Sequence, residues 1–294
     1  VYLANSGRTL RDVYSKTSWT TIREALGVAE KAPDSDFRSQ IAGRLKSLIH
    51  VDDEERARAY EALVSNPDLD LNNLSESLWP FAKMLAALLN TQNLDAGEIP
   101  NFIRDLRADR ELSAEIQSIV TISSDASRRV HRPLINGLEA CPLKSHATYT
   151  RAEILIGLGY QSNPKSHISG VAWCERSKTD ALLVTLRKSE KRFSPSTMYH
   201  DYALSPERFH WESQNATSAT SEVGRRYINH ASMGTNIVLF TRSQNTEDDI
   251  TGTYTCLGNS TYESHQGEKP MAITWRLTRP MPQDVYLDAS TVSN

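Results

Sequence analysis

The spacing of the apolar residues changes near residue 136, and this change predicts two differently folded parts. Before it, apolar residues recur every three or four positions, as in Phe37, Ile41, Leu45 and Leu48, which is typical of amphipathic helices. The ranges predicted as helices are 10–14, 18–26, 35–48, 52–64, 75–89, 99–107 and 110–120. Pro80 and Pro100 fit first turns, where proline is tolerated. The pattern therefore predicts an N-terminal helical bundle.

After residue 136 the apolar runs become short and rich in β-branched and aromatic residues, which is typical of strands. One short helix is expected first, because Thr150 and Glu153 have the spacing of a capping box. The ranges predicted as strands are 171–173, 181–186, 237–241, 253–257 and 271–277. Their number and order predict a compact β-barrel or a strongly bent sheet. The fold class expected is α+β, with domains at 1–136 and 137–294.

The connection between the two parts, residues 123–136, is polar and basic. Its Arg128, Arg129, His131 and Arg132 could contact phosphate, although a solvated linker cluster is the more ordinary interpretation.

Composition narrows the class of protein without naming a function. The net charge is −3, which excludes a histone-like polycation but not a local basic face. The three cysteines, Cys141, Cys174 and Cys256, lack the spacing of a zinc site or disulfide framework, and a reducing cytoplasm is the expected compartment. No apolar run is long enough to cross a membrane. The chain opens at Val1 rather than methionine, so it is interpreted as a fragment of a longer protein.

The most unusual stretch is Phe193–Asn215, which combines dense aromatic residues with Pro195 and Pro206. The prolines argue against a regular strand, and the segment as a whole shows no helical or strand period. We therefore expect a packed functional loop that forms a pocket or platform for a nucleic-acid base. The alternative, equally weighted on composition, is that Tyr202, Phe209 and Trp211 plug the open end of a barrel.

Basic residues flank this stretch on both sides, as expected for phosphate contacts beside base-stacking rings. Arg225 and Arg226 follow the stretch, and Arg242 ends the next predicted strand. The residues that precede it are Arg187, Lys188, Lys191 and Arg192.

A metal-dependent nuclease is the alternative from another functional class. Asp180 and Glu190 are acidic residues near one predicted strand, but they are too close in sequence for the two-strand arrangement that holds magnesium. Glu212 is followed by Ser-Gln rather than by a lysine two residues later. The sequence contains no phosphate-binding glycine loop and no GxSxG elbow. A third possibility is a protein-interaction module of a helicase, which predicts no affinity for DNA.

Four segments resemble one known family. They are HATYTRAEILIGLG, LLVTLRKSEKRFSPSTMYHDYALSPERFHWESQN, GRRYINH and YTCLGNSTYESHQGEKPMAITWRL, with FHWESQ the most specific block. They are similar to the C-terminal domain of bacterial superfamily II helicases fused to a phospholipase-D-type nuclease, the architecture of SauUSI-type modification-dependent (type IV) restriction endonucleases. The resemblance covers about residues 140–280.

The resemblance implies a division of labour within a longer polypeptide. ATP and magnesium would serve helicase and nuclease domains outside this chain, which itself would be non-catalytic and need no cofactor. The helical part would couple these domains to a DNA-recognition domain that reads 5-methylcytosine or 5-hydroxymethylcytosine in double-stranded DNA. Readers of this kind often have an SRA/PUA-like barrel and turn the modified base out of the duplex.

Within that interpretation, each candidate residue has an expected role. Tyr199, Tyr202, Phe209 and Trp211 would stack on the base or bound its methyl group. Asp201 is the first candidate to accept from the cytosine amino group, with Ser213 and Gln214 next, although each could instead order the backbone. His200 and His210 complete the predicted base-binding set. Phosphates would be held by Arg187, Lys188, Lys191, Arg192, Arg225 and Arg226.

Overall fold

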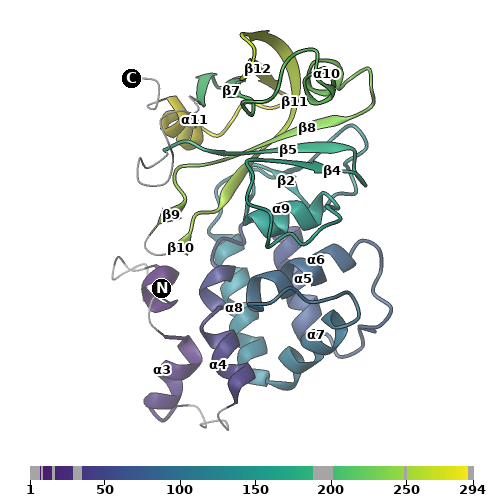
Figure 1. Ribbon diagram of the computed structural model, residues 1–294. Coiled ribbons are helices and arrows are strands. Elements are labelled where there is room, and N and C mark those ends of the chain that lie inside the picture. The colour runs from purple at the N-terminus through teal and green to yellow at the C-terminus, as the bar shows by residue number, and fades with distance from the viewer. Residues whose placement is uncertain are drawn as a thin grey trace. The chain divides into compact units, whose positions relative to one another are not determined.

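The computed structural model describes residues 7, 9–14, 17–28, 35–187, 201–247 and 250–290. The chain divides into two compact units, Val1–Arg128 and Arg129–Asn294. The first contains helices and the second is built on a mixed sheet, so the fold is α+β (Figure 1). None of the described helices is long and apolar enough to cross a membrane.

The described part of the first unit is helical, as its apolar periodicity predicts. Its elements are α2 (Leu10–Tyr14), α3 (Trp19–Ala25), α4 (Asp36–Ala42), the 3-10 helix η1 (Leu45–Leu48), α5 (Glu54–Ser65), α6 (Trp79–Leu89), α7 (Ile99–Ala108) and α8 (Arg110–Asp125). Ser18, Ser35, Asp53 and Asp109 cap four of these helices with their side chains. The single helix expected over 35–48 is instead two elements, α4 and η1.

Glu115 of α8 joins the N-terminal helices to the rest of the helical unit. Its buried carboxylate accepts a hydrogen bond from the Tyr14 hydroxyl at 2.8 Å. It also accepts from the backbone N–H groups of Trp19 and Thr20, in the first turn of α3. A carboxylate there satisfies helix donors that have no intrahelical partner and opposes the positive end of the helix dipole.

The second unit contains a sheet of 8 strands, most of which form the path β4-β5-β8-β11-β12-β7-β6, with β3 paired to β11. The strands of this sheet are β3 (Thr148–Tyr149), β4 (Val171–Cys174), β5 (Thr179–Thr185), β6 (Tyr202–Ser205), β7 (Arg208–Glu212), β8 (Asn236–Arg242), β11 (Tyr254–Gln266) and β12 (Ala272–Leu277). Two further pairs are β1 (Arg132–Pro133) with β2 (Lys144–Ser145) and β9 (Thr246–Glu247) with β10 (Ile250–Thr251). The helices are α9 (Arg151–Gly157), α10 (Glu222–Asn229) and α11 (Gln283–Ser290). β5 and β8 are parallel, and the other pairings are antiparallel.

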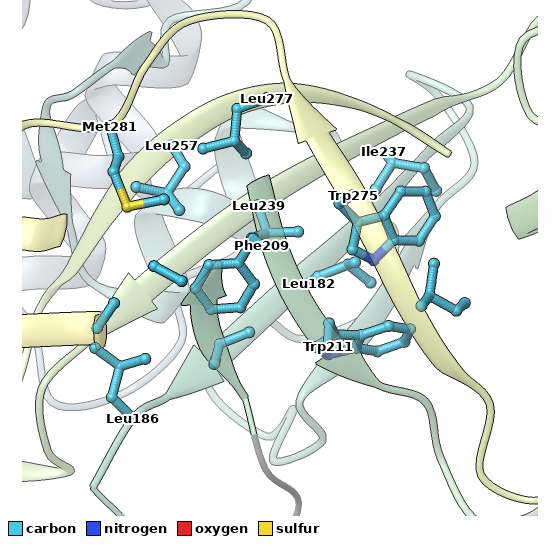
Figure 2. Close-up of a cluster of buried hydrophobic side chains, with 14 of the residues drawn as sticks. Leu182, Leu186, Phe209, Trp211, Ile237, Leu239, Leu257, Trp275, Leu277 and Met281 are labelled. Atoms are coloured by element: carbon cyan, nitrogen blue, oxygen red, sulfur yellow. The ribbon is translucent and has the colours of Figure 1, made fainter. Parts of the chain in front are cut away.

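This sheet is strongly bent, and it is not closed into a barrel among the described residues. β4 and β6 end the strand order and do not pair with each other. Leu182 and Leu239, from one part of the sheet, nevertheless pack in one core with Phe209, Trp211 and Trp275 from the other (Figure 2). The bent-sheet form of the prediction is therefore confirmed, and the SRA/PUA-like closed barrel is not.

The prediction of a loop over the whole aromatic stretch was wrong for residues 202–212. These residues form the hairpin β6–β7, and Pro206 lies in its turn, where no ladder hydrogen bond is lost. Phe209 and Trp211 alternate with Arg208, His210 and Glu212, so the strand has one apolar face and one polar face.

His146 connects β2 to β3 in an unusual backbone conformation. Its φ is 70°, in the left-handed region that residues other than glycine seldom adopt. Its N–H donates to the Cys256 carbonyl at 2.6 Å, and its side chain is 7% exposed. Burial, followed by the charges of Arg279 and Arg129, lowers the pKa of the imidazole from 6.5 to about 4.

Replacing Glu115 with glutamine is expected to loosen α2 and α3. The uncharged amide cannot accept from all three donors, so buried N–H or O–H groups lose partners at a cost of about 2 kcal/mol. Amide hydrogen exchange of α3 in the full chain measures this as faster local opening. The control is Glu111→Gln, whose half-exposed ion pair with Arg23 is worth no more than about 1 kcal/mol. Equal acceleration in both variants would contradict the role assigned to Glu115.

The β-rich unit is expected to lose stability as the pH falls from 6.5 toward 4. In this range the unfolded chain protonates His146 while the folded unit keeps it neutral, so protons favour unfolding. The contribution between pH 7 and pH 5 is about 2 kcal/mol. Urea unfolding of the wild type and of His146→Asn, which tolerates the positive φ, measures it. An identical pH dependence in the two proteins would rule out His146 as its source.

Candidate nucleic-acid interface

The predicted base-binding residues of the hairpin lie on opposite faces of β6 and β7. Phe209 and Trp211 are 0% and 4% exposed and belong to the core. The Trp211 ring meets the Tyr227 ring edge-on with centroids 5.5 Å apart, and its centroid lies 6.3 Å from that of Trp275. For these two residues stacking on a base stays a prediction, and it requires this closed aromatic cluster to open.

Tyr202 and His210 form a second aromatic feature on the polar face of the hairpin. They are cross-strand neighbours, and their half-buried rings are stacked with centroids 4.7 Å apart and planes 28° apart. A flat, partly exposed pair of this kind offers a π surface to a base without repacking the core.

Two of the three polar candidates, Asp201 and Ser213, hold backbone groups at one end of the hairpin, and the third, Gln214, bonds to a side chain. Asp201 Oδ1 accepts from the Glu212 N–H at 3.0 Å, and the carboxylate is buried. Ser213 Oγ accepts from the Met271 N–H at 2.8 Å, which ties β7 to the start of β12. Gln214 Nε2 donates to Ser169 Oγ at 3.1 Å. The bonds of Asp201 and Ser213 correspond to the backbone-ordering alternative, whereas that of Gln214 does not, and base contact by any of the three stays a prediction.

Five sequence candidates, Lys188, Lys191, Arg192, Tyr199 and His200, lie outside the described residues. The same holds for Glu190 of the nuclease alternative.

The basic candidates that are described have different environments. Arg225 on α10 is exposed, as a phosphate contact requires. Arg187, directly after β5, forms an ion pair with Asp288 of α11 at 2.6 Å while remaining 60% exposed. Both have side chains that DNA could reach.

Arg226 instead forms a buried ion pair with Asp180. Its Nε and Nη2 donate to the two carboxylate oxygens at 2.7 and 2.8 Å, and its guanidinium lies 4.3 Å from the Trp173 ring centroid. The hydrogen bonds to Asp180 raise the pKa of Arg226, while burial raises the pKa of Asp180. Removing one partner of such a pair typically costs about 3–5 kcal/mol.

This pairing also bears on the nuclease alternative. Asp180 is fully buried and directed at an arginine. Among the residues that the structure describes, no group of three or more His, Cys, Asp or Glu side chains is arranged to hold a metal ion.

A polar cavity of about 340 Å³ lies at the carboxyl ends of the parallel strands β5 and β8, where α/β proteins commonly bind ligands. Its lining includes Leu186, which follows β5, and Arg242 and Ser243 from the end of β8. Thr148, Thr241 and Thr255 supply hydroxyls, and Asp284 and Asp288 supply carboxylates. A volume of this size falls within the range of small-molecule pockets.

Arg242 supplies a cation to this cavity. Its Nε donates to Thr185 Oγ1 at 2.9 Å, Nη1 donates to the Gly252 carbonyl at 3.0 Å, and Nη2 donates to Asn245 Oδ1. Its guanidinium carbon lies 4.3 Å from the Tyr254 ring centroid. No carboxylate in the described part of the chain forms an ion pair with Arg242, and burial lowers its pKa.

Thr241 places a second functional group in the same cavity. Its Oγ1 is buried and has no hydrogen-bond partner among the described residues. A buried hydroxyl without a partner costs free energy, so a ligand that bonded to it would recover that cost. Sequence reasoning identified Arg242 as a basic strand end. It missed Thr241, whose only signal is its position one residue earlier.

A family model described as "Domain of unknown function (DUF3427)" matches residues 143–289. A solved structure titled "The 5-Hydroxymethylcytosine-Specific Restriction Enzyme AbaSI" shows a weak likeness, with a TM-score of 0.31 and 11% sequence identity. The likeness covers 65% of this chain and 57% of that one, and it carries no argument about function. No curated protein matches the chain. The family match spans half of the chain, from β2 to α11, and on this basis the chain belongs to the DUF3427 family.

Proposed function

We propose that residues 129–294 recognise double-stranded DNA carrying 5-methylcytosine or 5-hydroxymethylcytosine, as the DNA-recognition domain of an ATP-dependent type IV restriction enzyme. The helical unit would couple this domain to helicase and nuclease domains of the same polypeptide. The observation that carries the proposal is the cavity at the ends of β5 and β8, which is lined by Arg242 and by Thr241, whose buried hydroxyl has no hydrogen-bond partner among the described residues. The resemblance of the sequence to SauUSI-type enzymes supports it independently.

The groups in the cavity match the hydrogen-bonding edge of a cytosine. Cytosine presents an amino donor at N4, and the carboxylates of Asp284 and Asp288 are acceptors on the cavity wall. The guanidinium of Arg242 can donate to the ring nitrogen and carbonyl of the base. Leu186 and Val285 provide apolar surface for a 5-methyl group.

Base flipping is the mechanism by which a base of a duplex would enter this cavity. Inside a duplex, a 5-methyl group is a small apolar patch on the major-groove edge, whereas a cavity tests the whole outline of the base. Unstacking costs a few kcal/mol, which contacts in the cavity would offset. The Tyr202–His210 pair is the second surface on which a base could stack.

The proposal predicts that the chain binds a duplex containing modified cytosine more tightly than the same duplex with plain cytosine. Thr241→Val is expected to weaken binding of the modified duplex roughly three- to tenfold, the value of one hydrogen bond. Folding should be unaffected, because the hydroxyl has no partner to lose. Fluorescence anisotropy titrations with C, 5-methylcytosine and 5-hydroxymethylcytosine duplexes measure both effects.

Thr261→Val is the matched control, since its hydroxyl lies on the exposed part of β11, away from the cavity residues. Equal affinity of the wild type for all three duplexes at moderate salt would refute the proposal that the chain recognises modified cytosine. If the Thr241→Val variant still prefers modified over plain cytosine as strongly as the wild type does, the Thr241 hydroxyl does not contact the base.

Tyr202→Ala tests the second surface. If a base stacks on the Tyr202–His210 pair, the variant should lose roughly 1–3 kcal/mol of affinity for DNA, since each base–aromatic stack contributes about that much. Far-UV circular dichroism and the melting temperature should change little, because the ring is only half-buried. If Tyr202→Ala binds DNA as tightly as the wild type, no base stacks on the Tyr202–His210 pair, and the cavity remains the candidate site for the base.

A further inference from the structure

Three arginines lie in or beside the β1–β2 pair. Arg132 lies in β1, where it pairs with Ser145 of β2. Arg279, which follows β12, donates to Ser145 Oγ at 2.6 Å and to the Val130 carbonyl at 3.3 Å. Arg129 donates to the His146 carbonyl at 3.4 Å and to Thr255 Oγ1 at 3.1 Å. We refer to Arg129, Arg132 and Arg279 as the arginine cluster.

The charge of this cluster is only partly compensated. Arg129 forms an ion pair with Asp284. No carboxylate among the described residues forms an ion pair with Arg132 or Arg279. Burial and the charge of Arg132 lower the pKa of Arg279, so the two guanidinium groups are close enough to repel each other. Like charges held together in a folded protein favour the binding of an anion between them.

His146 provides an independent sign of a missing partner. Its side chain is 7% exposed, yet its Nε2 has no hydrogen-bond partner among the described residues. Its backbone is held at a φ of 70° directly after the Ser145 that Arg279 contacts. Strained residues and unsatisfied buried polar atoms tend to gather at ligand sites.

We propose that the arginine cluster is a phosphate-binding site for the backbone of nucleic acid. Arg132 and Arg279 would hold the phosphate oxygens, and His146 Nε2 would complete the site. Guanidinium groups suit this ligand, because their planar donors match phosphate oxygens in pairs. The inference goes beyond the proposed function, since a phosphate contact requires no modified base.

A polymer backbone fits the site better than a free phosphate compound. Arg132 is exposed, so the site is open to solvent on that side rather than enclosed. Arg129 belongs both to the cluster and to the wall of the cavity at β5 and β8. A strand whose phosphate lay on Arg132 and Arg279 would therefore pass beside that cavity, and neighbouring nucleotides would remain in contact with the protein.

Titration of unmodified duplex DNA with the full chain over a range of salt concentrations tests this site. Arg132→Ala is expected to reduce the slope of log K against log salt by about one, and to weaken modified and unmodified duplexes by the same factor. Arg279→Lys, which keeps the charge but loses the planar donors, should have a smaller effect on the slope. The matched control is Arg276→Ala, an exposed arginine whose partner is Glu263, and its slope should equal that of the wild type.

Each outcome separates this inference from the proposed function. A lower slope in Arg132→Ala alone supports the site even if the wild type fails to discriminate modified cytosine. If the salt slope of Arg132→Ala equals that of the wild type, the phosphate site is overturned even when the chain prefers modified cytosine. If the wild type does not bind DNA at all, both the phosphate site and the proposed function are overturned. Calorimetry with inorganic phosphate and with ATP tests the alternative that the site binds a free phosphate compound. Tighter binding of either compound than of duplex DNA, lost in Arg132→Ala, would overturn the assignment to a nucleic-acid backbone.

Discussion

The bend of β11 is the constraint on which the β-rich unit depends. The first half of this strand pairs with β3 and β8, and its second half pairs with β12. Register irregularities fall between Cys256 and Gly258 and between Tyr262 and Ser264, and such bulges bend and twist a strand. Gly258 has a φ of 93°, and a Cβ there would lie 3.3 Å from the Ser145 Cβ. A glycine is therefore required at the point where the sheet turns.

The bend determines both the core and the position of the cavity. Because the sheet folds back, the apolar side chains of β5 and β8 meet those of β7 and β12, and Trp275 is fully buried among them (Figure 2). At the carboxyl ends of β5 and β8, polar residues such as Thr241 and Arg242 line the cavity. A flat sheet would give neither an enclosed core nor this corner.

Local signals made much of the fold predictable, whereas long-range pairing made the rest unpredictable. Caps such as Ser18, Asp53 and the Thr150–Glu153 box act within four residues, so their helix starts follow from the sequence. The β7 strand was missed although Phe209 and Trp211 alternate cleanly with polar residues, because Pro206 was interpreted as evidence against a strand, whereas it lies in the turn before β7. The sequence could not decide between a closed barrel and a bent sheet, because closure depends on pairing between edge strands, which no local pattern encodes.

The roles of the arginines show the same limit at the level of the site. Arg225 and Arg226 are neighbours in sequence and were predicted to bind phosphate together, yet Arg226 pairs with an aspartate 46 residues away, and no carboxylate among the described residues pairs with Arg225. Arg132 was interpreted as part of a solvated linker, but Arg279 approaches its strand from 147 residues later in the chain. Whether an arginine is available to a ligand depends on which acids the fold brings to it. In this unit Asp180 pairs with Arg226 and Asp284 pairs with Arg129, whereas no carboxylate among the described residues pairs with Arg242, Arg132 or Arg279. That distribution is what a protein needs if it first holds a charged backbone without regard to sequence and then examines one base.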